Sequence, residues 1–157
     1  MTGSPVRCLA LLLAALQMTI VQTAGAETIR IDDSASLPSE STALLRWRQV
    51  APASGSEDTL EGEVAIAVRL NLLPVLNRTG RLYLVLPVQG TTPVRASWVT
   101  QGRLLPGEIT PGRRVAVFQG LVTTPYLEDT LALRIEADGN HLPDMQRLAF
   151  HFEFDAD

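Results

Sequence analysis

The sequence predicts an all-β fold, a single antiparallel β-sandwich of about seven to eight strands. Two observations predict it. Apolar and polar residues alternate with a period of two along several segments, which places successive side chains on opposite faces of a strand. Turns rich in Gly, Pro, Asn and Asp separate these segments at the spacing typical of a sandwich or barrel. The absence of heptads and of helices alternating with strands excludes coiled coils and parallel α/β folds.

The first half of the domain contains four expected strands. Residues 28–32 and 43–50 are the first two, and the second of these contains Trp47. A clear apolar stripe follows, formed by Val64, Ile66, Val68 and Leu70. Residues 81–88 are apolar almost throughout, which is typical of a central strand that is covered on both faces. Pro87 marks its end, because proline cannot donate to a strand ladder.

The second half continues the pattern. In residues 94–100, Ala96 and Trp98 share one face, and residues 114–119 form a short apolar segment. The next stripe consists of Leu131, Leu133 and Ile135. In the last strand, one face carries Leu148, Phe150, Phe152 and Phe154. Because aromatic side chains bury large apolar areas, this strand is expected to run through the core.

These stripes predict the core of the domain. Its expected members are Val64, Ile66, Val68, Leu82, Leu84, Leu86, Trp98, Leu131, Leu133, Ile135, Phe150 and Phe152. One short helical turn is expected in residues 121–129 or in residues 143–147. An immunoglobulin-like sandwich is the favoured fold, without the cysteine pair of antibody domains.

Residues 1–26 have the three parts of a secretory signal peptide. Arg7 gives the amino-terminal part its charge, residues 8–21 form a short apolar run, and Ala24-Gly25-Ala26 is a small-x-small cleavage pattern. We therefore expect cleavage after Ala26 and a single domain at residues 27–157. The expected location is the periplasm or the exterior, and a bacterial cell envelope fits a domain without disulfides.

Composition narrows the class of partner. The only cysteine is Cys8, so residues 27–157 contain no disulfide and no thiol nucleophile. Without Arg7 the domain has 12 arginines, no lysine and 17 acidic residues, a net charge of −5. Nucleic acids and anionic membranes require a basic surface, which this balance disfavours. Residues 8–21 of the signal are too few to cross a bilayer, and no membrane span is expected in the mature chain. Prolines in several strands and an aromatic content of 5% also disfavour a membrane barrel.

The sequence offers little for catalysis. A serine or threonine nucleophile needs a nearby base, and the chain has only His141 and His151. His151 is expected on the outward face of the last strand, and His141 in the preceding loop. No serine lies in a nucleophile elbow. A small periplasmic hydrolase is therefore the least favoured function, and the sequence predicts a non-enzyme without a cofactor.

The sequence offers two candidate ligand sites. Asp138, Asn140 and Asp144 lie in one loop and offer oxygen ligands that calcium accepts, but the rest of the EF-hand pattern is missing. Trp47 and Tyr126 are the aromatic residues best placed to be exposed and to stack on a sugar. A carbohydrate- or calcium-binding sandwich is therefore the alternative function.

The leading hypothesis is a non-catalytic accessory protein that binds another envelope or surface protein, for example in appendage or envelope assembly. Because the charges are dispersed, contact is expected through backbone at a sheet edge. The terminal strand at residues 28–32 is the candidate, with Ile29 and Ile31 as the partner-binding side chains.

Overall fold

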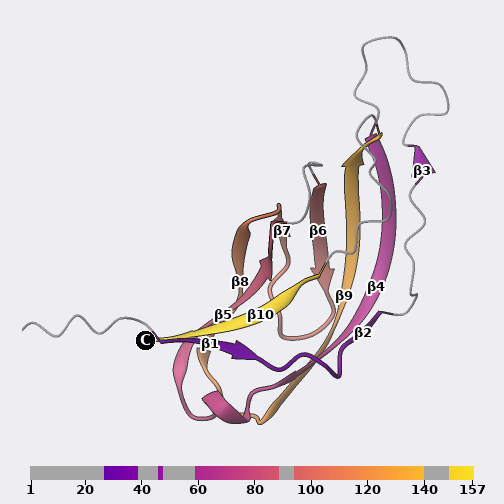
Figure 1. The fold of residues 1–157 in the computed structure, drawn as a ribbon. Coiled ribbons are helices and arrows are strands. Elements are labelled where there is room, and N and C mark those ends of the chain that lie inside the picture. The colour runs from indigo at the N-terminus through magenta and orange to yellow at the C-terminus, as the bar shows by residue number, and fades with distance from the viewer. Residues whose placement is uncertain (1–26, 39–45, 48–58, 89–93, 140–148) are drawn as a thin grey trace, which may run out of the picture.

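The structure is a computed structural model that describes residues 27–38, 46–47, 59–88, 94–139 and 149–157. These residues form two antiparallel β-sheets that pack face to face (Figure 1). In chain order the elements are β1 (Thr28–Ile31), β2 (Leu37–Pro38), β3 (Arg46–Trp47), β4 (Thr59–Asn71), η1 (Leu73–Val75), β5 (Thr79–Leu86), β6 (Val94–Thr100), β7 (Gly107–Ile109), β8 (Arg113–Leu121), β9 (Tyr126–Asp138) and β10 (His151–Ala156).

Sheet A has the strand order β1-β10-β5-β8. β10 lies inside this sheet and buries Phe152 and Phe154, which confirms the core strand predicted at the carboxyl end. β5 also has a neighbour on each side, as its apolar sequence predicts. Gly80 begins the close contact between β5 and β10, because a Cβ at this position would lie 2.6 Å from Cζ of Phe154. Only glycine fits there without movement of its neighbours.

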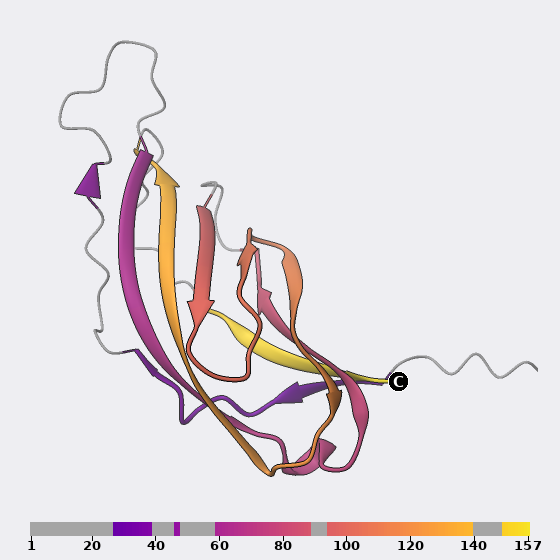
Figure 2. The ribbon, with the colours of Figure 1, turned by 180° about the vertical axis from the view of Figure 1, so that it is seen from behind.

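Sheet B has the order β2-β4-β9-β6-β7, and β3 pairs with β4 beside β2. β4 and β9 each have 13 residues and pair along their whole length, from Thr59 opposite Asp138 to Asn71 opposite Tyr126. The two strands curve together around the core and reach beyond the other strands (Figure 2). β4 and β9 therefore form the longest strand pair among the described residues.

At both sides of the sandwich, the chain crosses from one sheet to the other. Asp32, which follows β1 in sheet A, forms a bridge with Asn71 of β4, and the Asn71 N–H donates to the Asp32 carbonyl at 3.0 Å. On the other side, β7 of sheet B is followed closely by β8 of sheet A. The Leu105 N–H donates to the Val117 carbonyl at 2.7 Å and joins these two regions.

The core lies between the sheets and contains side chains from both. Of the twelve predicted members, nine are buried: Val68, Leu82, Leu84, Leu86, Trp98, Leu131, Leu133, Ile135 and Phe152. Val64, Ile66 and Phe150 are half-buried and pack against them. The Trp98 indole N–H donates to the Leu105 carbonyl at 3.0 Å, which satisfies its one polar atom inside the core. The predicted face assignment is therefore confirmed.

Three details differ from the sequence predictions. The described residues form ten strands instead of seven or eight, because β2 and β7, of two and three residues, are too short to show alternation. β3 lies within the strand predicted at residues 43–50, of which the structure describes only Arg46–Trp47. No helical turn lies in residues 121–129, where β8 ends and β9 begins. A 3₁₀ turn instead lies at Leu73–Val75, where Pro74 fits the first turn of a helix. Residues 143–147, the other expected helical turn, lie outside the described residues.

Candidate functional site

β1 forms one outer edge of sheet A. Its side chains Ile29 and Ile31 point toward the core, where Ile31 is 1% exposed and Ile29 packs against buried neighbours. The strand predicted from the sequence is therefore present, and β10 pairs with one side of it. The two isoleucines anchor β1 to its own domain, so a partner at this edge would meet backbone and outward side chains.

The orientation of the β1 backbone follows from Asp32. Its carbonyl points away from β10, since it accepts from Asn71 of the other sheet. Backbone groups of alternate residues in a strand point the same way, so those of Thr28 and Arg30 also point away from β10. Sheet A ends at β1, which leaves this side of Thr28–Ile31 without a neighbouring strand among the described residues. The arrangement is an open edge two residues long.

A polar network covers the outer face of sheet A beside this edge. The Asp155 carboxylate accepts from the Thr28 hydroxyl at 2.8 Å and from the Arg114 guanidinium at 2.6 Å. The same guanidinium stacks 3.9 Å from the ring centroid of Tyr83. Burial favours the neutral form of Asp155, but the hydrogen bonds from Arg114 and Thr28 outweigh it and hold the pKa of this carboxyl below its ordinary value. The network ties β1, β10 and β8 together.

The histidines form no catalytic arrangement among the described residues. His151 lies on the outward face of β10, as predicted, but its side chain is only 12% exposed and its Nε2 lies 3.1 Å from a Glu153 carboxylate oxygen. Its hydrogen-bonding partner is therefore an acid, with no serine or threonine hydroxyl in the contact. His141 lies outside the described residues.

The two aromatic residues proposed for sugar stacking lie at opposite ends of sheet B. Trp47 pairs with Leu60 and Tyr126 pairs with Asn71. Leu60 and Asn71 are eleven positions apart on β4, a distance of about 37 Å along an extended strand. Tyr126 is exposed, with the Arg69 guanidinium 5.7 Å from its ring centroid. The structure therefore places these two strand positions far apart, at opposite ends of β4.

The acidic loop is only partly described. Asp138 is the last residue of β9, whereas Asn140 and Asp144 lie outside the described residues. Glu128 lies near the other end of the same extended strand, about 34 Å from Asp138 at the usual rise per residue, too far to share an ion. In the part of the chain that the structure describes, no three His, Cys, Asp or Glu side chains gather to hold a metal.

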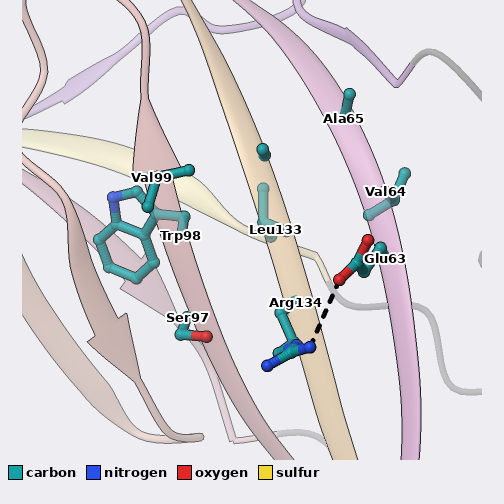
Figure 3. Close-up of a pocket in the computed structure, with 9 residues that line it drawn as sticks. Glu63, Val64, Ala65, Ser97, Trp98, Val99, Leu133 and Arg134 are labelled. Carbon is teal, nitrogen blue, oxygen red and sulfur yellow. Dashed lines mark ion pairs between the residues drawn. The ribbon is translucent and has the colours of Figure 1, made fainter.

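A shallow hollow lies on the outer face of sheet B and was not predicted. It has a volume of about 570 Å³ and is lined by Glu63, Val64, Ala65, Ser97, Trp98, Val99, Ala132, Leu133 and Arg134. These residues belong to three adjacent strands, β4, β9 and β6 (Figure 3). Glu63 and Arg134 point toward one another across its rim, with 3.6 Å between the carboxylate and the guanidinium. Small side chains at its centre leave the hollow open.

The sequence contained a signal for this surface. On an exposed sheet face, polar residues are expected to alternate with the core residues. Ala65 and Ala67 on β4 and Ala132 on β9 instead occupy outward positions, and Ala132 and Ala67 are exposed. Alternation alone could not show that these alanines lie side by side, since that depends on the pairing of Ala65 with Ala132.

No helix among the described residues is long and apolar enough to cross a membrane. No protein-family model, curated protein or solved structure matches the chain. Its function is therefore inferred from the geometry of its own residues.

Proposed function

We propose that the chain is an exported, non-catalytic accessory protein of a bacterial cell envelope or surface, which binds another protein by strand addition at β1. The observation that carries this proposal is the edge of sheet A, where the outward side of Thr28–Ile31 has no neighbouring strand among the described residues. Main-chain hydrogen bonds from such an edge supply affinity without a charged patch.

Export is supported by residues 1–26 alone. Their charged start at Arg7, apolar run and Ala24-Gly25-Ala26 ending favour cleavage before Glu27 and a periplasmic or secreted location. The intact mass of protein from an extracytoplasmic fraction tests this part. A mass that corresponds to a chain beginning at Glu27 is expected, and a chain that retains Met1 contradicts it.

The strand order supports an immunoglobulin-like topology. That fold places strands A, B, E and D in one sheet and C, F and G in the other. Here β2-β4-β9-β6 has the order of the first sheet, and β5-β10 has the order of C and F. β1 takes the place of the terminal strand G, and β8 extends the sheet beyond β5. In this reading the partner-binding edge is the one that strand G would form.

In this proposal the side chains and the backbone of β1 have different roles. Ile29 and Ile31 hold the strand against the core, which keeps the edge in an extended conformation before binding. Thr28 and Arg30 direct their backbone groups outward and can pair with an incoming strand. A rigid edge lowers the entropy cost of association, because only the partner must become ordered.

A photo-crosslinking residue at position 30 tests the proposal in the cells that produce the protein. We expect one discrete crosslinked species that contains another extracytoplasmic protein. The same residue placed at Leu121, an exposed position on β8, serves as the control. Adding Thr28→Pro removes an outward N–H and should abolish the crosslink, whereas added salt should leave it unchanged, because screening weakens exposed charge contacts far more than main-chain hydrogen bonds. Equal crosslinking at both positions contradicts the proposal.

A further inference from the structure

The centre of the outer face of sheet B is a band of small and apolar side chains. It comprises Ala65 and Ala67 on β4, Ala132 and Thr130 on β9, with Leu37 of β2 at one side and Val99 of β6 at the other. Leu37 is 67% exposed and Val99 is 62% exposed. Single exposed apolar residues are ordinary, but a continuous apolar band indicates a contact surface.

Charged residues border the band at both ends in a regular pattern. On β4, Glu63 lies at one end and Arg69 at the other, whereas β9 has Arg134 opposite Glu63 and Glu128 opposite Arg69. Arg69 and Glu128 are 3.1 Å apart, and all four residues are exposed. Between residues 63 and 69 of β4 and residues 128 and 134 of β9, each strand therefore has one outward acid and one outward base, in reversed order relative to its neighbour. Glu61, which also pairs with Arg134 at 3.8 Å, and Glu136 lie beyond these segments.

This pattern is complementary to itself. When two such faces meet across a two-fold axis that runs along the strands, β4 of one copy lies over β9 of the other. Arg134 then faces Glu63 of the second copy, and Glu128 faces Arg69 of the second copy. A two-fold interface uses the same patch on both subunits, so a patch must complement itself in this way.

We propose that this face is the interface of a homodimer, with the two-fold axis between β4 and β9. In this arrangement β2 of one copy lies over β6 of the other, so the two most exposed apolar side chains of the band, Leu37 and Val99, approach one another. Glu63 of the second copy enters the hollow beside Arg134 and Ser97. The small side chains allow the two sheets to pack at about 10 Å with a small angle between their strands.

The size of the band sets the strength of the dimer. Four strands at about 4.8 Å and the seven residues from Glu63 to Arg69 at about 3.4 Å each give roughly 450 Å² per copy. The total of roughly 900 Å² lies in the range of weak, transient interfaces. We therefore expect a weak dimer. It is independent of the partner at β1, which occupies the other sheet.

Proximity of Leu37 and Val99 is tested by crosslinking. The full chain with Cys8→Ser receives either Leu37→Cys or Val99→Cys, and a short bismaleimide is added. Each single variant alone should yield little crosslinked dimer, because the two-fold axis separates like positions. A mixture of the two variants should yield it in quantity. Equal yields in all three samples, or none in the mixture, would overturn the arrangement.

Charge reversal tests the pattern itself, with sedimentation velocity as the measurement. Arg134→Glu should raise the dissociation constant at least tenfold, and Glu63→Arg together with Arg134→Glu should restore it. Arg78→Glu, which removes an exposed ion pair with Glu27 elsewhere, should leave it unchanged. All variants should keep the wild-type circular dichroism spectrum. A wild-type chain that sediments as a monomer at its highest soluble concentration overturns the proposal, as does a double variant that stays monomeric.

Discussion

Two neighbouring residues of β10 show that the effect of a substitution on stability depends on the face of the strand that carries the side chain. Phe152 is 4% exposed between the sheets, whereas His151 lies on the outer face beside Glu153. Phe152→Ala should lower the free energy of unfolding by about 3–5 kcal/mol, because it removes a buried ring and leaves a cavity. His151→Ala should lower it by at most about 1 kcal/mol, since only a polar contact is lost. Urea unfolding of both variants measures the difference, and equal midpoints would contradict it.

Asp129 is an acid on the inner face of β9, opposite Val68. Its carboxylate accepts from the backbone N–H groups of Gln101, Leu104 and Thr130 at 3.2, 2.7 and 2.7 Å. It thereby holds the turn that leads from β6 to β7. Asp129→Ala should lower the free energy of unfolding by about 1–3 kcal/mol, because these donors lose their acceptor. Hydrogen exchange should show loss of protection first at Leu104, and unchanged protection there would contradict this role.

Asp155 makes stability depend on acid pH. Burial favours its neutral form, yet the hydrogen bonds from Arg114 and Thr28 lower its pKa below the ordinary value. Between the lowered pKa and about 3.9, the unfolded chain binds a proton that the folded chain does not, so stability rises with pH. The contribution is complete above about pH 5 and is lost as pH falls through the folded pKa.

Asp155→Asn should therefore reduce the loss of stability between about pH 5 and pH 2, measured by urea unfolding at each pH. Arg114→Gln should reduce it in the same direction, because the donor that lowers the pKa is gone. A variant whose stability falls as steeply as that of the wild type would show that other groups cause the acid dependence.

At the scale of the element, β1 shows two sides with different tasks. Ile29→Pro removes an N–H on the side that faces β10 and should destabilise the fold by about 3 kcal/mol or more. Arg30→Pro removes an outward N–H at an open edge, where proline is tolerated, and should change stability by less than about 1 kcal/mol. Thermal unfolding compares the two variants. If Arg30→Pro is the more damaging, the orientation inferred from Asp32 is wrong.

Segment alternation predicted most strands and the side of each that is buried. The stripe on β9, the central position of β5 and the burial of Trp98 are confirmed. β2 and β7 were not predicted, because two or three residues show no period, whereas β3 lies within the strand predicted at residues 43–50. Asp129 is another exception to the alternation. It is an acid at an inward position, where its carboxylate accepts hydrogen bonds from the turn between β6 and β7.

The candidate site was predictable only in part. Alternation and its terminal position indicated that residues 28–32 form an edge strand, and β1 does form an edge of sheet A. The sequence did not predict that the side chains of Ile29 and Ile31 point toward the core, because a strand of four residues does not show which of its faces meets the core. The band on sheet B was missed because its members come from segments far apart in the chain.

At the scale of the whole molecule, one core joins the two sheets. It contains Ile31, Leu84 and Phe154 from sheet A with Leu70 and Leu133 from sheet B. Because neither sheet can keep its inner face buried alone, we expect a single two-state transition.

Fluorescence of the buried Trp98, measured in a Trp47→Phe variant, should change at the same urea concentration as the far-ultraviolet circular dichroism. Separate midpoints for the two signals would mean that the sheets unfold independently.

The sequence by itself determined that the side chains of Leu82, Trp98 and Phe152 enter the core. Their burial depends on the two-residue period of extended backbone and on the aversion of apolar groups for water, both local properties. Only the tertiary structure decided that β1 joins β10 and that β4 joins β9. Strand pairing joins segments that are far apart in the chain, and the packing of the whole core determines which strand edges pair. The open edge of β1 and the self-complementary pattern around Ala132 are consequences of that pairing.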